Sequence, residues 1–251
     1  MLEVIFLSVV QGITEFLPVS SSAHLILISN YFNFENQNLT IDMSLHAGSL
    51  FAILYYFKSE LLNFKKNKNL YTKILIASVP TLIVGYFLVK LNIIEQLRNY
   101  KVIGFTTIIF GILLYFADKA PISKKITNTF NFRSTIVIGL YQVLSLVPGV
   151  SRSGITISAA RILNYNREDS AKISFLLSIP ILVVITIFNI FSLYEMNNFS
   201  FSILNIISIF FSFILSLTTI KYFLSYVKKF SLNVFVIYRI ILGAIILLLI
   251  K

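Results

Sequence analysis

The chain alternates long apolar runs with short polar segments, and this alternation predicts helices that cross a membrane. A helix needs about 20 residues to span the hydrocarbon core, and about 17 is near the minimum. Runs of this length, or nearly so, cover residues 43–57, 74–90, 102–117, 173–194, 201–226 and 234–250. The pattern therefore predicts an all-α, polytopic integral membrane protein with about six spanning helices.

Four shorter apolar segments flank two polar loops in pairs, at residues 2–16, 23–32, 134–147 and 155–165. Each is too short to cross a bilayer by itself. Irregular backbone at membrane depth must be buried in protein or line a cavity, because lipid offers it no hydrogen bonds. We therefore expect two re-entrant helix hairpins, each with both of its ends on one side of the membrane.

The composition supports a membrane protein and excludes several other classes. With 57% hydrophobic residues, 12% charged residues and a mean hydropathy of +0.86, the 251 residues cannot hide their apolar surface in one water-soluble core. The absence of Cys excludes disulfides and thiolate metal sites. Residues 1–4 carry no basic segment and no cleavage site follows, so we expect the amino terminus to belong to the mature fold.

The net charge of +11 comes from basic residues in the loops between apolar runs, which is typical of membrane topology and not of nucleic-acid binding. If residues 58–73 are cytoplasmic, only Lys90, Arg98, Lys101 and Lys251 lie outside. The basic residues then on the cytoplasmic side are Lys58, Lys65, Lys66, Lys68, Lys73, Lys119, Lys124, Lys125, Arg133, Arg167, Lys172, Lys228 and Lys229. This bias predicts the orientation of the chain.

The same orientation predicts an internal repeat within one membrane domain, residues 1–251. Residues 1–118 would run as a hairpin entered from outside and three spans, and residues 119–251 as a hairpin entered from the cytoplasm and three spans. Such halves are inverted-topology repeats, with both hairpin tips near the midplane. Sequence similarity between them is limited to an apolar run, Pro18 or Pro148, and Ser21 or Ser151 three residues later.

The two polar loops contain groups that suit an anion. Arg152 would cost about 2.5 to 3.5 kcal/mol at the bilayer centre, so we expect it to face a functional site. Its planar guanidinium can bind phosphate through two hydrogen bonds, and helix N-termini attract anions. The hydroxyl groups near the two helix starts belong to Ser20, Ser21, Ser22, Ser151, Ser153 and Thr156. Together these groups predict a cradle for phosphate.

The first loop adds groups that could react. Ser21 and His24 are three residues apart on one side of a helical turn, so the imidazole could accept a proton from the hydroxyl or deliver one to a leaving group. Gln11 and Glu15 are four apart on the preceding helix and could aim oxygens at one point. A carboxylate with phosphate oxygens is a usual site for Mg²⁺ or Ca²⁺.

Several of these residues have structural alternatives. Ser20, Ser22 and Ser153 are equally well explained as helix caps, because Ser is a preferred N-cap residue. We favour a structural or interfacial role for His46 at the end of a span. Arg161 has an alternative role in which its side chain extends to the membrane surface.

The two loops also resemble the signature motifs of a known family, the bacterial undecaprenyl-diphosphate phosphatases linked to bacitracin resistance. The resemblance is carried by residues 11–25 (QGITEFLPVSSSAHL) and 148–156 (PGVSRSGIT). It extends to residues 42–49 (DMSLHAGS) and 235–239 (FVIYR), and so spans the whole chain.

The resemblance implies a hydrolase that removes the terminal phosphate of undecaprenyl diphosphate and so recycles the lipid carrier for peptidoglycan synthesis. It implies Ser21 as nucleophile or hydroxyl ligand, His24 as its acid/base partner and Glu15 as metal or base residue. The implied cation is Mg²⁺ or Ca²⁺, held by Glu15 and Gln11. The implied clamp on the diphosphate is Arg152, assisted by Ser151, Ser153 and Thr156.

The family resemblance also implies a location and partners. We expect a multi-pass protein of the bacterial inner membrane whose active site faces the outer side, with a polyprenyl diphosphate as substrate, membrane lipid around it and no nucleic acid. The oligomeric state is not fixed by the sequence, and a homodimer is one expectation.

Two other classes of membrane protein share parts of this pattern. The other large group of membrane lipid phosphatases needs a nucleophilic His about six residues after its motif Arg, where this chain has Ser158, and so it does not fit. A transporter or lipid flippase stays an alternative, because inverted repeats with helix ends at the midplane are typical of secondary transporters.

Overall fold

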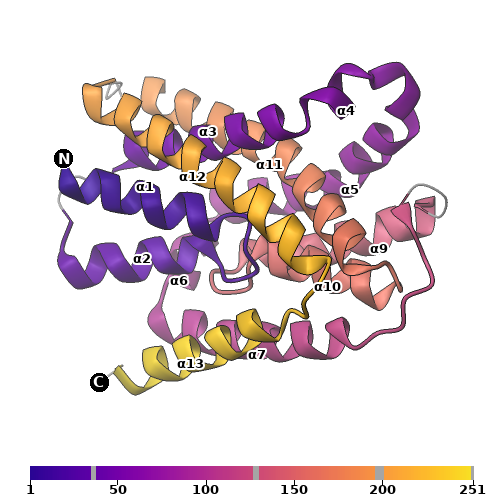
Figure 1. Ribbon diagram of the computed structural model, residues 1–251. Helices are drawn as coiled ribbons and strands as arrows, with labels where there is room; N and C mark the ends of the chain where they lie inside the picture. Colours follow the sequence, from indigo (N-terminus) through magenta and orange to yellow (C-terminus); the bar gives the residue numbers. More distant parts are fainter. Residues whose placement is uncertain (35–37, 127–129, 196–200, 250–251) are drawn as a thin grey trace.

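The structure, a computed structural model, describes residues 1–34, 38–126, 130–195 and 201–249. Within these ranges the chain forms helices and no β-strand (Figure 1). In chain order the helices are α1 (Leu2–Thr14), α2 (Ser21–Phe32), α3 (Leu39–Tyr56), α4 (Lys58–Leu62), α5 (Phe64–Lys90), α6 (Ile93–Leu97), α7 (Tyr100–Asp118), α9 (Phe132–Val143), α10 (Arg152–Ile162), α11 (Arg167–Glu195), α12 (Ile203–Val227) and α13 (Asn233–Leu249), with a 3₁₀ turn at Leu144–Leu146.

The six expected spans fall on α3, α5, α7, α11, α12 and α13; the last expected position, residue 250, lies outside the described residues. Of the helices in the described ranges, four are long and apolar enough to cross a membrane by themselves, at Asn67–Lys90, Tyr100–Asp118, Arg167–Glu195 and Ile203–Val227. The helix α13 has 17 residues, and α3 has 18 but includes Asp42 and His46. The expected all-α, polytopic membrane architecture is confirmed.

The four short apolar segments form two helix–loop–helix units, as expected. The first unit joins α1 to α2, and the second joins α9 and its 3₁₀ turn to α10. Both breaks contain a Pro, Pro18 or Pro148, which has no N–H and cannot continue the hydrogen-bond ladder of a helix. The chain thus places irregular backbone in the middle of an apolar segment twice.

Three helices begin at an Asn that caps their first turn. The side-chain oxygens of Asn38, Asn99 and Asn131 accept hydrogen bonds from the backbone N–H groups of Ile41, Val102 and Ser134, at 3.0, 2.9 and 2.9 Å. An N-cap satisfies one of the four N–H groups that a helix start leaves without a partner, and contributes about 1 kcal/mol. These residues fix where α3, α7 and α9 begin.

Each hairpin packs against a long helix of the other half of the chain. The first hairpin helix, α1, lies along α12, and the first helix of the second hairpin, α9, lies along α5 (Figure 1). Between these pairs α3 packs on both α11 and α12, and α7 packs on α13. In a two-fold repeat, each half is expected to pack its hairpin on a helix of the other half, as α1 and α9 do here. The division of the chain at residues 118 and 119 stays a prediction.

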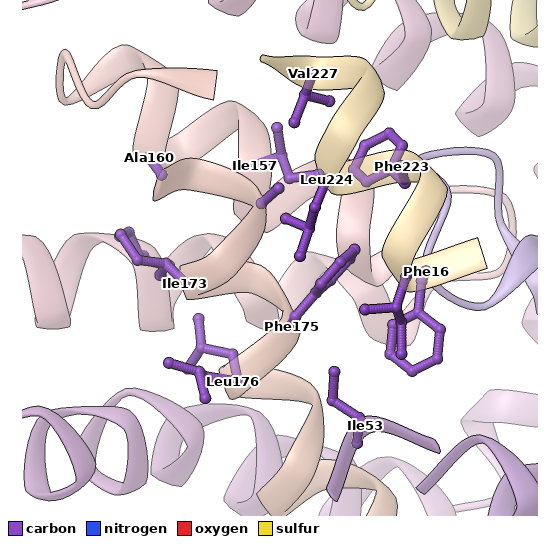
Figure 2. Close-up of a cluster of buried hydrophobic side chains, with 14 of the residues drawn as sticks. Phe16, Ile53, Ile157, Ala160, Ile173, Phe175, Leu176, Phe223, Leu224 and Val227 are labelled. Atoms are coloured by element: carbon purple, nitrogen blue, oxygen red, sulfur yellow. The ribbon is translucent and has the colours of Figure 1, made fainter. Parts of the chain in front are cut away.

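The largest apolar cluster lies directly beside the two loops. Phe16 of the first loop packs edge-on against Phe175 of α11, with ring centroids 5.2 Å apart, and Phe175 packs on Phe223 of α12 at 5.8 Å (Figure 2). Both Phe16 and Phe175 are fully buried. This packing attaches the first loop to the helices of the second half and sets its position.

Candidate active site

The two loops enter their second helices with the same backbone conformation. Ser20, before α2, has φ +74°, and Ser151, before α10, has φ +71°, a conformation that residues other than Gly seldom adopt. The Oγ of Ser20 lies 3.3 Å from that of Ser22, and the Oγ of Ser151 lies 3.2 Å from that of Ser153. The spacing from Pro18 and Pro148 had paired Ser21 with Ser151. The backbone conformation instead makes Ser20 the equivalent of Ser151.

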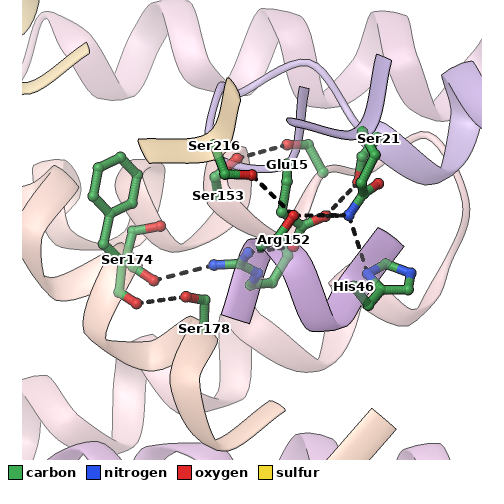
Figure 3. Close-up of polar contacts among 12 residues, drawn as sticks. Glu15, Ser21, His46, Arg152, Ser153, Ser174, Ser178 and Ser216 are labelled. Atoms are coloured by element: carbon green, nitrogen blue, oxygen red, sulfur yellow. Dashed lines mark hydrogen bonds and ion pairs between the residues drawn. The ribbon is translucent and has the colours of Figure 1, made fainter. Parts of the chain in front are cut away.

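This one-residue shift makes Ser21 and Arg152 equivalent, and both contact the same carboxylate. Arg152 Nη2 donates to Glu15 Oε1 at 2.6 Å, and Ser21 Oγ donates to Glu15 Oε2 at 2.7 Å (Figure 3). Glu15 is 8% exposed, and the side chain of Arg152 is 11% exposed. The structure thus brings three of the predicted catalytic residues together between the two loops.

Gln11 supports this carboxylate from one turn earlier in α1. Its Nε2 donates to Glu15 Oε2 at 3.0 Å and lies 3.1 Å from Nδ1 of His46. An amide nitrogen donates hydrogen bonds and does not accept them, so Nδ1 of His46 is the acceptor in this contact. His46, for which the sequence favoured a structural or interfacial role, is therefore a member of this polar cluster (Figure 3).

Arg152 is held on its other side by α11. Its Nη1 donates to the carbonyl of Ser174 at 3.2 Å, and its guanidinium lies 5.9 Å from the ring centroid of Phe16. Thr156 Oγ1 donates to Ser174 Oγ at 2.7 Å, and Ser153 Oγ donates to the carbonyl of Leu17 at 2.7 Å. These hydroxyls connect the loops to each other and to α11.

The five residues predicted to bind substrate differ in how accessible their hydroxyl groups are. Ser151 accepts from the N–H of Gly154 at 3.1 Å, as a helix cap does. Thr156 is fully buried and bonded within the protein. Ser22 is exposed, next to the half-buried Ser21, and so these two hydroxyls at the start of α2 are the more accessible ones.

His24 is bonded to residues other than Ser21. Its Nδ1 donates to the carbonyl of Ser20 at 2.7 Å, so its Nε2 carries no proton and accepts from the hydroxyl of Tyr238 at 2.5 Å. The two rings are stacked, with an interplanar angle of 7°. No hydrogen bond joins Ser21 to His24 in the described ranges, and the predicted direct contact of this pair is not found.

Arg239, on α13, binds the backbone of both loops. Its Nη1 donates to the carbonyls of Pro18 and Val150 at 3.1 and 3.0 Å, and its Nη2 donates to that of Gly149 at 2.9 Å. It is fully buried. Sequence reasoning gave Tyr238 and Arg239 no role beyond the motif at residues 235–239, although a polar pair inside an apolar run could have singled them out.

The residues present can share a divalent cation with a phosphate but cannot hold one alone. In the part of the chain that the structure describes, no three His, Asp or Glu side chains gather as metal ligands. Gln11 Oε1 is buried, and among the described residues it has no hydrogen-bond partner. Mg²⁺ is commonly bound by one or two carboxylates and substrate phosphates, so Glu15 and Gln11 Oε1 fit such a site.

A carboxylate, a hydroxyl and a guanidinium thus meet between two loops of a helical membrane protein and form a buried polar cluster. Residues 4–245 match the family described as bacitracin resistance protein BacA, and the chain belongs to this family.

Three relatives are similar over nearly their whole length, and each is named undecaprenyl-diphosphatase. The protein of Pelagibacter ubique (strain HTCC1062) is 49% identical over 250 residues, which cover 99% of this chain and 97% of the relative. That of Saccharophagus degradans is 40% identical, with 97% and 96% covered. That of Jannaschia sp. is 37% identical, with 96% and 95% covered.

The carbonyl contacts of Arg239 predict a large effect on stability. In Arg239→Met the loop carbonyls lose their donors, at about 1–3 kcal/mol for each buried group, so we expect Tm in detergent to fall by about 5 °C or more. Arg239→Lys should fall between this variant and the parent. Lys221→Met, an exposed change on α12, is the control. An Arg239→Met protein as stable as the control would show that the loops do not depend on this residue.

Proposed function

We propose that this chain is an undecaprenyl-diphosphatase, which hydrolyses undecaprenyl diphosphate to undecaprenyl phosphate and inorganic phosphate. Membership of the BacA family and the names of its relatives support this activity. The observation that carries the proposal is that Glu15 contacts both Ser21 Oγ and Arg152 at the point where the loops meet. This activity recycles the lipid carrier for peptidoglycan synthesis and confers bacitracin resistance.

Arg152 binds the diphosphate. Its guanidinium can present two parallel N–H groups to phosphate oxygens, and such charge-assisted hydrogen bonds are the stronger ones. The N-termini of α2 and α10 lie beside it and favour the same negative charge. The substrate would therefore lie between the loops, with its lipid chain directed toward the membrane.

Ser21 attacks and Glu15 accepts its proton. The hydroxyl already donates to Glu15 Oε2 at 2.7 Å, which is the geometry of a nucleophile and its base. The Ser21 oxygen forms a bond to the terminal phosphorus, and the bridging P–O bond breaks, so that undecaprenyl phosphate leaves with the bond electrons. Water then attacks the phosphorus of the phosphoserine, the P–Oγ bond breaks, Glu15 returns its proton to Ser21 Oγ, and inorganic phosphate leaves. Direct attack by water, oriented by the same two residues, is the alternative path.

His24 contributes through Tyr238. The N–H group at Nδ1 of His24 makes a hydrogen bond to the carbonyl of Ser20, and Nε2 accepts a hydrogen bond from the Tyr238 hydroxyl. Both ring nitrogens are thus occupied, so a substrate would meet the Tyr238 hydroxyl and not the imidazole. Tyr238 is 42% exposed, whereas His24 is 8% exposed. We expect His24 to fix the orientation of the Tyr238 hydroxyl, whose oxygen remains able to accept a hydrogen bond at the substrate.

A divalent cation would be held by Glu15 and Gln11 Oε1 together with phosphate oxygens. When bound, it would reduce the repulsion between the substrate's negative charge and an incoming nucleophile. Gln11 then has two roles, because its Nε2 orients Glu15 while its Oε1 remains available.

The membrane of residence is the bacterial inner membrane, with the site facing the outer side. The excess of basic residues between the spans supports the orientation, and membership of the BacA family supports the outer side for the site.

The activity is tested by phosphate release from undecaprenyl diphosphate with the purified full-length chain in detergent. We expect release that falls on addition of EDTA, and a loss of about two orders of magnitude or more in Ser21→Ala, the usual scale for removing a group that acts directly in proton transfer. Ser225→Ala, on the exposed face of α12, is the matched control. Absence of release by the parent protein would favour a transporter, and full activity in Ser21→Ala would exclude Ser21 as the nucleophile.

The role of Arg152 is tested by separating kcat from KM. If its guanidinium stabilises charge that develops during phosphoryl transfer, Arg152→Lys and Arg152→Ala should lower kcat more than they raise KM, with Ala the more severe change. A change confined to KM would limit Arg152 to substrate capture. Unchanged kcat/KM would make it only the structural partner of Glu15.

The orientation is tested by labelling single cysteines, since the chain has none of its own. Ser59 and Asn92 are exposed and lie before and after α5. We expect Asn92→Cys to react with an impermeant maleimide in intact cells, and Ser59→Cys to react only after permeabilisation. The reverse result would invert the orientation.

A further inference from the structure

A cavity of about 430 Å³ lies at the end of α7 and the start of α13, away from the residues that contact Glu15. Its polar lining includes Asp118, Lys119, Arg161, Arg167 and Asn233. These two helices lie side by side (Figure 1), and the cavity is at the end of both. The side chains around it do not take part in the proposed phosphatase reaction.

The lining of this cavity has an excess of positive charge. Three cations, Lys119, Arg161 and Arg167, face one carboxylate, that of Asp118. Arg167 occupies both oxygens of that carboxylate, with Nε–Oδ1 at 2.6 Å and Nη2–Oδ2 at 3.0 Å, and the N–H of Leu232 also donates to Oδ2 at 3.0 Å. Asp118 pairs with Arg167 and, at the longer distance of 3.7 Å, with Arg161, so one carboxylate serves three cations and the lining keeps a net positive charge.

Arg161 is the buried member of this set. Its Nη2 donates to the carbonyls of Asp118 and Ala120 at 2.9 and 2.5 Å, while its Nε lies 3.7 Å from Asp118 Oδ1, too far for a hydrogen bond. Arg161 is 1% exposed, and its Nε is buried and lacks a hydrogen-bond partner among the described residues. Its Nη1 also donates to the carbonyl of Tyr165, so three backbone carbonyls and the nearby carboxylate of Asp118 surround this charge.

An apolar groove continues from this cavity along α7 and α13. Its volume is about 400 Å³, and its lining includes Ile112, Tyr115, Phe116, Ile237 and Ile240. Asn233 lines both spaces, and Lys119 of the cavity lies 4.1 Å from the ring centroid of Tyr115 in the groove. A cationic end and an apolar channel thus form one continuous surface.

We propose that this surface binds an anionic lipid, with its phosphate in the cavity among Lys119, Arg161 and Arg167 and one hydrocarbon chain in the groove. Basic pockets between transmembrane helices, at the level of the headgroups, bind such lipids. The position fits, because Asp118 ends α7 and Asn233 begins α13, so the cavity is at the end of both apolar segments. Free phosphate would match the cavity but would leave the groove unused.

The test measures binding of phosphatidylglycerol, phosphatidylcholine and inorganic phosphate to the full-length protein in detergent, from the rise of Tm with ligand concentration. We expect phosphatidylglycerol to bind, phosphatidylcholine to bind much more weakly, and Lys119→Gln to bind phosphatidylglycerol about fivefold more weakly, the effect of one basic residue near a membrane surface. Ile237→Gln should weaken binding of the lipid and leave that of phosphate unchanged.

Two control variants match these changes. Lys58 lies 4.2 Å from the ring centroid of Tyr55, much as Lys119 lies against Tyr115, and it does not line the cavity. Ile241 is 54% exposed on the same helix as Ile237 and does not line the groove. Lys58→Gln and Ile241→Gln should bind phosphatidylglycerol like the parent.

Three results would overturn the proposal. Equal binding of phosphatidylglycerol by Lys119→Gln and Lys58→Gln would place the lipid elsewhere. Equal binding of phosphatidylcholine would show that the charge is not recognised. An effect of phosphate as large as that of the lipid, with Ile237→Gln unaffected, would identify a free-phosphate site. None of these results depends on phosphate release, so the proposed enzymatic activity is tested separately.

Discussion

A single buried guanidinium holds together the parts of the molecule on which the site depends. Arg239 Nη1 donates to carbonyls of both loops, those of Pro18 and Val150. Irregular backbone at membrane depth has carbonyl groups that lipid cannot satisfy, and each would cost about 1–3 kcal/mol without a donor. The same carbonyl dipoles stabilise a buried cation that has no ion-pair partner in the described ranges. Arg239 therefore satisfies the loop carbonyls, and these carbonyls stabilise its buried charge in return. Because this arrangement holds both loops, it also helps to set the distance between Glu15 and Arg152.

The ion pair between Glu15 and Arg152 gives the empty site a different charge balance from the occupied one. Without substrate the two groups neutralise each other, as buried charges must. A diphosphate brings negative charge and competes with Glu15 for the guanidinium. In the proposed reaction Arg152 would turn to phosphate, and Glu15 would then lose one hydrogen-bond donor and become a better proton acceptor for Ser21. Substrate binding would in this way activate the base, and an empty site would stay inactive.

The sequence predicted the helices well because their apolar runs are long and their breaks contain Pro and Ser. It also singled out Glu15, Ser21 and Arg152, since charged and hydroxyl groups are rare inside apolar segments; the structure brings these three side chains into contact, while their catalytic roles stay predictions. It could not show that His24 binds Tyr238 and not Ser21, because that contact joins α2 to α13 across the whole chain. The position of His46 beside Gln11 likewise depends on how α3 packs on α1. Helical spacing indicates which side chains share a face, but tertiary packing decides which of them meet.

The two loops have similar backbone conformations but carry different functional side chains. Gln142 and Leu146 precede Ser151 by the same spacing as Gln11 and Glu15 precede Ser20, and Arg152 stands where the first loop has Ser21. Gln142 is fully buried, and neither end of its amide has a hydrogen-bond partner among the described residues, whereas Gln11 orients Glu15. The first loop thus supplies the carboxylate and the hydroxyl, and the second supplies the cation. In the proposed reaction the two phosphates of the substrate also differ, because the terminal phosphorus is attacked while the other phosphate leaves with the lipid. Two loops of similar backbone conformation could thus serve two different tasks, with Glu15 and Ser21 at the attacked phosphorus and Arg152 on the phosphate oxygens.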